Sequence, residues 1–335
     1  MNRIRIILSV IWSGINQGVR AMVKLGWVRS VILPTHSIGV GNLQAGGAGK
    51  TPLVIEIARQ AVARGLSVAV LTRGYRSVWE KSGGVVPPGV RQIDPEFSGD
   101  EAALIHDSVP EVWIGVGADR LESYQKICES IRVADGRPLD LVILDDAFQH
   151  WKIRCHQSVI AVTDARVGER VFRDRFSAAR SSDLIVLTKG EDYPDALKRH
   201  ALKLKTRFVY PAPPEKISFR LVAAIGDPQR ARESLEKAGF AIARLHSFPD
   251  HALFSKTEVS RILDDAKNAG ERVLLTGKDW VKWRALGISE EWVSVVEPLL
   301  AIGRLPVENP DEPVSTDQKL WDRVIWGGLP GKSVK

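Results

Sequence analysis

The amino-acid sequence predicts an α/β protein: a doubly wound parallel sheet of the P-loop NTPase-like type, with a second, smaller α/β domain. The first observation is a series of short apolar runs that alternate with helical stretches up to residue 190, which is the pattern of a parallel sheet covered by helices. The second is a glycine-rich loop, GGAGKT at 46–51, between a strand and a helix. The third is a new alternation of strands and helices after residue 210.

The elements of the first domain follow one another in a regular order. A β-branched run at 35–42 ends in Gly41-Asn42, and the segment 51–65 has apolar residues at helical spacing before a terminal glycine. The other buried strands are expected at 68–71, 112–116, 139–144, 157–165 and 182–190, with a loop at 83–95 and a helical patch at 99–109.

Three prolines in PAPPEK, residues 211–216, indicate a linker. Beyond it the segments ISFRLVAAIG, DPQRARESLEKAGF, AIARLHSF, KTEVSRILDDAKNAG, RVLLTGKDWVKW and EWVSVV alternate between strand and helix patterns. We therefore expect a basic amphipathic segment at 1–30, a P-loop core domain at 31–210 and a second α/β domain at 211–335. The C-terminal part of that last segment is a candidate for a return to the core.

Composition restricts the partners and the compartment. The 335 residues carry a formal charge of +7, which favours an anionic partner such as a phosphate ester, a nucleic acid or an acidic membrane face. No recognised nucleic-acid reader motif accompanies the charge. The two cysteines, Cys128 and Cys155, form neither a disulfide framework nor a paired metal motif, so we expect a reducing, cytosolic environment. Cys155 stands beside His156, and we attribute that pair to packing.

The N-terminal segment is basic and apolar at once. No acidic residue precedes Glu56, and arginines flank the run IILSVIWSGINQGV at 6–19. This run is shorter than the roughly 20 residues that span a bilayer, and no signal-peptide cleavage site follows it. Two interpretations remain: a helix in the membrane interface, with Trp12 and the isoleucines in the acyl boundary, or a plain core helix.

The loop GNLQAGGAGKTPLV at 41–54 nearly matches the phosphate-binding pattern GxxxxGK[ST], but Gln44 replaces the first glycine. Its later parts are intact. Peptide N–H groups would cradle the phosphates of ATP, Lys50 would bridge the β and γ groups, and the Thr51 hydroxyl would hold Mg²⁺. We therefore predict a nucleotide site. Its residues are Gly46, Gly47, Ala48, Gly49, Lys50, Thr51 and Pro52.

An acidic element is needed to complete a magnesium site beside such a loop, and the end of a buried strand is its expected place. Asp145 and Asp146 directly follow the apolar run at 139–144. Two adjacent carboxylates at that point could also cap the next segment. Beside a phosphate loop we interpret them as metal-binding, and the sequence leaves open which of the two contacts the ion.

Two further residues are ambiguous by spacing alone. In FSGDEAAL, Asp100 fits a helix N-cap and Glu101 suits the positive end of the helix dipole. In FPDHALF, His251 is one loop histidine among others. Neither pattern identifies a catalytic group without further information.

The chain carries six motifs in this order over most of its length: VGNLQAGGAGKTP, LTRGY, GDEAALI, VILDDAFQH, FPDH and LLTGKDWVK. Taken together they resemble the tetraacyldisaccharide 4'-kinases of lipid A biosynthesis. The resemblance implies a two-domain kinase that transfers the γ-phosphate of ATP to the 4'-hydroxyl of a tetraacylated glucosamine disaccharide 1-phosphate, giving lipid IVA, at the cytoplasmic face of the bacterial inner membrane. It implies a membrane-embedded lipid substrate and an anionic membrane surface as partners, with no nucleic acid and no obligate protein partner.

The resemblance also implies roles for individual residues. Lys50, Thr51, Asp145 and Asp146 match the loop and the acidic pair of the family, and Asp100 matches the aspartate that activates the sugar hydroxyl. His251 matches the histidine that pairs with it, brought across by domain closure. The residues that match cleft-lining or phosphate-contacting positions are Tyr75, Gln149 and His150, and Arg73 and Arg120.

The sequence departs from the family pattern in three places. Ala252 replaces a second histidine after Asp-His, and Gly277 replaces the glutamate of Thr-Glu-Lys-Asp. The stretch Arg166–Arg180 lacks the Pro-Ala-Gly-Pro-Leu-Arg-Glu string, with RDRFSAAR in its place. These departures concern the substrate pocket and acyl-chain preference rather than the ATP and metal parts.

Two other functions are compatible with the loop. One is a P-loop kinase or ligase with a soluble substrate. The other is a membrane-associated P-loop ATPase switch, in which hydrolysis times the binding of a partner and no small molecule is phosphorylated. Such switches usually carry a lysine directly before the two glycines, where this chain has Ala45, and this disfavours the switch.

Overall fold

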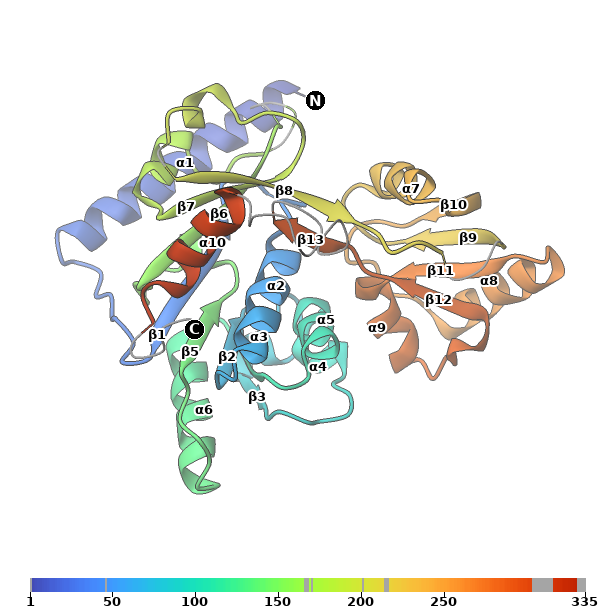
Figure 1. Cartoon of the computed structure of the whole chain (residues 1–335), viewed down its shortest axis with the longest axis horizontal. Coiled ribbons are helices and arrows are strands. Elements are labelled where there is room, and N and C mark those ends of the chain that lie inside the picture. The colour runs from blue at the N-terminus through green and yellow to red at the C-terminus, as the bar shows by residue number, and fades with distance from the viewer. Residues whose placement is uncertain are drawn as a thin grey trace.

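The computed structural model describes residues 2–45, 47–165, 169, 171–200, 202–213, 217–302 and 316–329. Two sheets lie side by side in it (Figure 1), one of nine strands and one of four. The α/β fold class predicted from the alternating apolar runs is confirmed. The strands of the larger sheet are β1 (His36–Asn42), β2 (Val68–Thr72), β3 (Gly84–Val86), β4 (Trp113–Val116), β5 (Leu141–Leu144), β6 (Gln157–Thr163), β7 (Leu184–Lys189), β8 (Lys203–Val209) and β13 (Leu299–Ile302).

The order of the larger sheet is β13-β8-β7-β6-β1-β5-β2-β4-β3. Strands β1, β2 and β4 to β8 run parallel, and the edge strands β3 and β13 pair antiparallel to β4 and β8. Because β1 lies between β5 and β6, the loop after β1 meets the aspartates after β5 at one edge of the sheet. The carboxyl ends of parallel strands are where such sheets bind ligands. The segment 83–95, expected to be a loop, contains β3.

Helices cover both faces of this sheet. On one face lie α2 (Lys50–Ala63), α5 (Asp100–Ser108) and α10 (Thr316–Trp326), with their buried side chains in one cluster with those of β1 and β5. On the other face α6 (Arg120–Val133) packs against β2 and β5. The short elements of this domain are α3 (Trp79–Ser82), α4 (Pro95–Ser98), η1 (Ala147–Gln149), η2 (Phe176–Ser181) and η3 (Asp195–Leu197).

The smaller sheet has the order β10-β9-β11-β12, with every pairing parallel. Helices α8 and α9 pack on one face and α7 on the other. The elements are β9 (Ser218–Ala223), α7 (Pro228–Lys237), β10 (Ala241–Ser247), α8 (Lys256–Asn268), β11 (Arg272–Thr276), α9 (Gly277–Ala285), η4 (Glu290–Trp292) and β12 (Val293–Val296).

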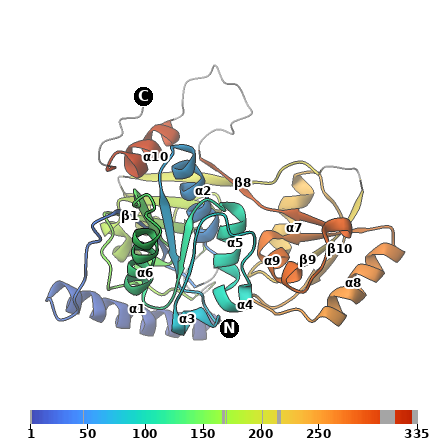
Figure 2. The same ribbon diagram turned by 90° about the horizontal axis from the view of Figure 1, so that it is seen from below.

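The chain crosses between the two sheets twice. It leaves the larger sheet after β8 and returns through β13, which pairs antiparallel with β8 between Leu299 and Val209 at one end and Ile302 and Thr206 at the other. Helix α10 then lies over the larger sheet (Figure 2), where Trp321 is fully buried and its indole N–H donates to Gln60 of α2 at 2.9 Å. The larger domain is therefore completed by residues that follow the smaller one.

Helix α1 (Asn2–Lys24) has its polarity reversed relative to an ordinary surface helix. Its small polar residues Ser9, Ser13 and Asn16, which are spaced along one face, are buried against the larger domain. The opposite face exposes apolar side chains, among them Ile7 at 58% and Ile11 at 55%. The apolar side chains of this helix therefore face away from the protein.

By length and composition α1 is a helix that could cross a membrane, and little of its apolar window is buried in the protein. The expectation that its apolar run is too short to span was therefore wrong as a length argument. Two hydrogen bonds show how α1 is attached to the folded domain. Ser9 Oγ accepts from the Phe172 N–H at 2.8 Å, and Asn16 Nδ2 donates to the Arg173 carbonyl at 2.7 Å. These bonds hold α1 against the larger domain.

Candidate active site

The phosphate loop leaves β1 through a buried anchor. Gln44, which stands where a glycine was expected, is 2% exposed, and its Oε1 accepts from the Thr163 hydroxyl at 3.0 Å at the end of β6. Asn42 Nδ2 donates to the Gln44 carbonyl at 2.5 Å. The side chain of Gln44 thus fixes the entrance of the loop, so a glycine is not needed at that position.

The loop ends at the N-terminus of α2. Gly49 precedes the helix with a φ of 73°, a left-handed conformation that glycine adopts at little cost. Lys50 and Thr51 follow in the first helical turn, with Pro52 where N–H groups have no intrahelical acceptor. Ala48 is buried, and its carbonyl accepts from the Thr188 hydroxyl at 2.7 Å. Gly46, also predicted to bind nucleotide, lies outside the described residues.

The two aspartates after β5 occupy different environments. Lys50 Nζ lies 3.3 Å from Asp146 Oδ1, and Arg173 Nη1 lies 3.1 Å from Asp146 Oδ2. Asp145 is 1% exposed and is approached by the Thr72 hydroxyl at 3.4 Å. Asp146 has a φ of 52°, which turns the chain sharply so that adjacent carboxylates point to different partners.

These environments shift the two carboxyl groups in opposite directions. Burial, together with the Glu101 carboxylate, raises the pKa of Asp145 to about 7. Burial would also raise the pKa of Asp146, but the charges of Lys50 and Arg173 outweigh it and lower that pKa to about 2. Asp146 is therefore a fixed anion beside the loop lysine, and Asp145 is a carboxyl group whose ionised form needs a further cation.

The residues here fit a magnesium ion held partly by phosphate oxygens. Asp145 Oδ1 is buried without a hydrogen-bond partner, and Thr51, in the first turn of α2, lines the cleft beside the phosphate loop. Among the described residues no three His, Cys, Asp or Glu side chains cluster as metal ligands. A site that depends on protein ligands alone is therefore not present in that part of the chain, whereas Mg²⁺ on nucleotide phosphates requires only one or two protein ligands.

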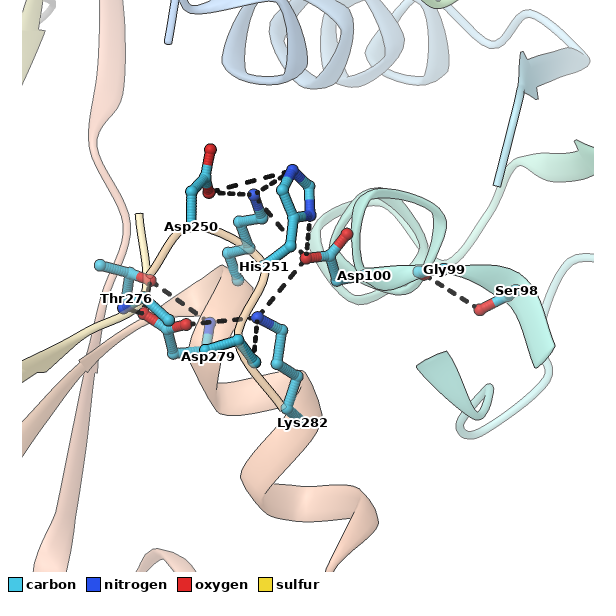
Figure 3. A network of polar contacts seen from close by, with 11 residues as sticks. Ser98, Gly99, Asp100, Asp250, His251, Thr276, Asp279 and Lys282 are labelled. Atoms are coloured by element: carbon cyan, nitrogen blue, oxygen red, sulfur yellow. Dashed lines mark hydrogen bonds and ion pairs between the residues drawn. The ribbon is translucent and has the colours of Figure 1, made fainter. Parts of the chain in front are cut away.

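Asp100 meets His251 across the domain boundary (Figure 3). His251 Nδ1 lies 3.0 Å from Asp100 Oδ2, and the Asp100 side chain is 10% exposed. Gly99, not Asp100, is the N-cap of α5, so the alternative in which Asp100 merely caps the helix is wrong. His251 has a φ of 64° in the turn after β10. This left-handed backbone at a non-glycine residue is a strained feature of the kind found at functional sites.

Two lysines of α9 complete this cluster, and the sequence analysis did not identify them. Lys282 Nζ lies 3.5 Å from Asp100 Oδ2 and donates to the Ala252 carbonyl at 3.1 Å. Lys278 Nζ lies 3.7 Å from the same Asp100 oxygen. Burial alone would raise the pKa of Asp100, but the hydrogen bond from His251 and the two ammonium charges hold it far below its usual range. Two signals for the lysines were available: their spacing of four residues on a predicted helix, and their place in the motif LLTGKDWVK.

The Asp100–His251 pair predicts a pH-dependent stability. The hydrogen bond to Asp100 raises the pKa of His251 above 6.5 against burial and the nearby Lys278 ammonium, with Asp250 also raising it. A raised folded-state pKa stabilises the protein fully below the unfolded pKa and less as pH rises through the folded value. The difference in urea midpoint between wild type and His251→Gln should therefore shrink from pH 6 to pH 9. When both proteins also carry Asp100→Asn, the difference in urea midpoint should no longer depend on pH. If the difference between wild type and His251→Gln were the same at pH 6 and pH 9, the predicted role of the Asp100–His251 pair in stability would be contradicted.

The predicted substrate residues lie in two groups. Tyr75 is 47% exposed, and its ring centroid lies 6.0 Å from that of His251. Arg73 is exposed at the same turn and is paired with Glu80 at 2.7 Å. Tyr75 therefore lies beside the Asp100–His251 pair, whereas Arg73 is engaged by a carboxylate in this structure.

The second group lies next to the acidic pair. Arg120 is buried at the start of α6, where burial lowers its pKa and the charges of Asp146 and Asp145 oppose that shift. Burial and the Arg120 charge also lower the pKa of His150 to about 4. Gln149 Nε2 donates to the Asn42 carbonyl at 3.1 Å. Gln149 therefore contacts the end of β1, from which the phosphate loop leaves, while Arg120 lies near the acidic pair and His150 lies near Arg120.

The segment that replaces the expected Pro-Ala-Gly-Pro-Leu-Arg-Glu string supplies two more site residues. Arg173 binds Asp146, and Asp174 Oδ2 accepts from Gln149 Nε2 and from Arg20 Nη2 of α1, each at 3.0 Å. Asp174 is 1% exposed. RDRFSAAR thus brings an arginine and a carboxylate to the site, and it connects helix α1 to the acidic pair.

A cleft of about 570 Å³ lies between the two domains. Residues 47–52 of the loop line one wall, and Gly226, Arg230, Asp250 and Lys278 of the smaller domain line another. Phe208 of β8 and Tyr210, which directly follows that strand, also border it. Its size is within the range of small-molecule sites, and it presents cations and backbone N–H groups to an anionic ligand.

The other two departures from the family motifs are Gly277 and Ala252, and neighbouring residues explain how each fits the structure. At Gly277 a Cβ would overlap Glu297 Oε1, so the Glu297 side chain fills the space that a side chain at 277 would need. Ala252 is half-buried, and its carbonyl is the acceptor for Lys282. Residue 252 therefore contributes to the cluster around Asp100 through its backbone carbonyl, which binds Lys282.

The comparisons with known proteins agree on one family. The family model described as tetraacyldisaccharide-1-P 4'-kinase matches residues 1–305. A tetraacyldisaccharide 4'-kinase of Shewanella woodyi is 29% identical over 95% of this chain and 88% of its own length. One of Pelobacter propionicus is 29% identical over 88% of this chain and 86% of its own length. A solved structure of LpxK from Aquifex aeolicus in complex with ATP has a TM-score of 0.71 and 22% identity, covering 97% of this chain and 99% of that one.

Proposed function

Since the chain belongs to the tetraacyldisaccharide-1-P 4'-kinase family, we propose that the cleft between its domains is where this lipid A kinase transfers the γ-phosphate of ATP to the 4'-hydroxyl of its disaccharide substrate. The product of that reaction is lipid IVA. The observation that carries the site assignment is the meeting of Asp100 and His251, 3.0 Å apart, from two domains that also share the loop-lined cleft.

On the nucleotide side, the backbone N–H groups at the N-terminus of α2 and the Lys50 ammonium bind the phosphates. Lys50 is held at 3.3 Å from Asp146, so its ammonium is positioned before the nucleotide arrives. A related solved structure in complex with ATP supports ATP as the donor. Thr51 with Asp145 or Asp146 would hold Mg²⁺, which when bound neutralises charge on the phosphate oxygens.

On the acceptor side, Asp100 is the general base. The contacts that the structure gives for its carboxylate all fall on Oδ2, from His251, Lys278 and Lys282, so Oδ1 is the oxygen for the substrate hydroxyl. The 4'-oxygen forms a bond to the γ-phosphorus while the bond from that phosphorus to the β–γ bridging oxygen of ATP breaks. The hydroxyl proton passes to Asp100, and ADP leaves with the bond's electrons.

Helix α1 provides the contact with the membrane in this proposal. Its outward face carries Ile4, Ile7, Ile11 and Ile15, all more than half exposed, and no carboxylate lies in its first turn. Apolar side chains directed away from the protein, with arginines at both ends, suit the interface of an anionic bilayer. In this proposal the lipid substrate stays in that bilayer, and the exposed apolar face of α1 supports a location of the kinase at the cytoplasmic face of the inner membrane.

The triple substitution Ile7→Ser, Ile11→Ser and Ile15→Ser should weaken binding to vesicles containing phosphatidylglycerol by at least roughly a hundredfold, because each buried isoleucine contributes about 1.5–3 kcal/mol. Co-sedimentation measures this. Val133→Ser, which removes an exposed apolar side chain from the end of α6, is the control and should bind normally. Unchanged sedimentation of the triple variant, with a lower melting temperature, would instead identify α1 as a core helix.

The direct test incubates the full chain with Mg²⁺ and ATP labelled at the γ-phosphate, together with tetraacyl disaccharide 1-phosphate in detergent micelles. Label should appear on the lipid and be lost when the 4'-position is blocked. Hydrolysis of ATP without labelled lipid would favour a membrane-associated ATPase switch, and label on a soluble sugar would favour a kinase of another substrate.

A further inference from the structure

Among the described residues, Lys278 is one of three cations of the smaller domain, with Arg230 and Lys237, that line the cavity containing the phosphate loop, and of these it is the one in contact with Asp100. It is the second residue of α9, and its side chain lines the cleft together with Lys50 and Thr51. Its Nζ lies 3.1 Å from Asp250 Oδ1, 3.3 Å from His251 Nε2 and 3.7 Å from Asp100 Oδ2. Lys278 is therefore positioned between the candidate base and the nucleotide cleft.

Lys282 offers a comparison on the same helix. It also reaches Asp100 Oδ2, at 3.5 Å, but its side chain is 6% exposed and is not part of the cleft wall. Its other partners are the Ala252 carbonyl and Asp279 at 3.6 Å. Figure 3 shows Lys282 between Asp279 and Asp100. Lys282 is thus enclosed by protein groups, whereas Lys278, at 17% exposed, borders open space.

The geometry of phosphoryl transfer restricts where the γ-phosphate can lie. A general base is about 2.6–3.2 Å from the hydroxyl oxygen, and that oxygen is about 3–3.5 Å from the phosphorus it attacks. If Asp100 is the base, the phosphorus lies within about 7 Å of its carboxylate. An ammonium 3.7 Å from that carboxylate and on the cleft wall can reach an oxygen of the transferring group.

We propose that Lys278 is a catalytic residue that binds the transferring phosphate from the wall opposite Lys50, exchanging its contact with Asp100 for a phosphate oxygen. This inference rests on the proposed role of Asp100. As Asp100 takes the hydroxyl proton it becomes neutral, so the Lys278 charge is no longer matched by that carboxylate while negative charge accumulates on the phosphate. Lys278 itself forms and breaks no covalent bond.

The cluster also explains how Asp100 could act as a base despite its surroundings. With three cationic groups on one oxygen, a carboxylate is a weak proton acceptor. Withdrawal of Lys278 to the phosphate removes one of them, and the His251–Asp100 bond and Lys282 keep the carboxylate in place. In the neutral form of His251, Nδ1–H donates to Asp100 and Nε2 accepts from Lys278; in the protonated form Nε2–H faces Asp250, 3.9 Å away.

Lys278→Met is the first test. It should lower kcat by roughly 10²–10³-fold, the usual loss for one donor to a developing charge. Isothermal titration without metal, in EDTA, should show weaker ATP binding and unchanged ADP binding, because only ATP carries the γ-phosphate. Lys278→Arg should restore part of kcat and part of the ATP affinity, since an arginine also binds phosphate.

Lys282→Met is the matched variant, because it removes the other ammonium from the same carboxylate oxygen. It should leave the ratio of ATP to ADP affinity at the wild-type value and move the acidic limb of the pH–rate profile upward, since Asp100 loses a cation. Lys256→Met, on the surface of α8, should leave kcat and both affinities unchanged. Circular dichroism and melting temperature establish that each variant is folded.

One pattern would overturn the inference: Lys278→Met and Lys282→Met both move the acidic limb and neither alters the ATP to ADP affinity ratio. Lys278 would then be an ion-pair partner of Asp100 only. A fully active Lys278→Met enzyme would overturn it as well. Failure of the proposed function gives a different result, because wild-type protein would then transfer no label to the lipid.

Discussion

Replacing Lys50 with alanine lowers kcat for lipid phosphorylation by roughly 10³-fold or more, the largest effect we expect from one substitution. Lys50 is the loop cation at the start of α2 and lies 3.3 Å from Asp146. Its loss removes the ammonium that would neutralise the β- and γ-phosphates. It also leaves Asp146 with Arg173 as its remaining ion-pair partner among the described residues. Single-turnover kinetics with labelled ATP measures the chemical step directly.

Arg59 provides the matched control for this substitution. It is a cation of the same helix, and it lines the cleft away from the acidic pair, near Glu297 at 3.7 Å. Arg59→Met should change kcat far less than Lys50→Ala. If Lys50→Ala retained near-normal single-turnover rates, the loop would not be the site of phosphoryl transfer, and the P-loop assignment would be wrong.

Asparagine at position 100 lowers kcat by roughly 10²–10⁴-fold, the range for loss of a general base, while ATP binding persists. Asparagine has nearly the shape of aspartate and can still accept a hydrogen bond from His251, so the cleft is preserved. It cannot take the hydroxyl proton. Kinetics under saturating ATP, with binding measured by titration, separate the two effects.

Asp107 provides the control for a purely structural role. It lies on the same helix as Asp100 and forms an ion pair with Arg284 of α9 at 2.6 Å, so it also joins the two domains. Asp107→Asn should cost stability with little loss of kcat. If both substitutions lowered the melting temperature alike and neither lowered kcat more than about tenfold, Asp100 would be a structural interdomain contact and the base would have to be sought elsewhere.

The local sequence pattern was sufficient to predict those parts of the site that consist of a strand and the loop that follows it. The loop after β1 and the aspartates after β5 could be placed side by side because parallel strands end at a common edge. The anchor at Gln44 was not predictable, because its partner Thr163 lies 119 residues away on another strand. Spacing reports neighbours along an element and carries no information on such contacts.

The cluster at the domain boundary could be found only from the structure, because its contacts also join residues that are far apart in the sequence. By pattern alone Asp100 fits a helix cap, and its contact with His251 spans 151 residues. Lys278 and Lys282 have the spacing of ordinary polar residues on an amphipathic helix. The burial of Lys282 follows from the packing of α9 against α5, which no local periodicity encodes. The resemblance to the kinase family supplied roles for Asp100 and His251, whereas Lys278 and Lys282 stood in the motif LLTGKDWVK without an assigned role.

The return of the chain through β13 has a consequence for the order in which the enzyme is made. The edge strand beside β8 and the helix that covers α2 with Trp321 come after the whole of the smaller domain. Domains of a nascent chain generally fold from the N-terminal end during synthesis. Here the helix that begins with the loop lysine lacks part of its cover until residue 326 has left the ribosome. The kinase therefore gains its complete nucleotide-binding domain only after the whole of the smaller domain has been synthesised.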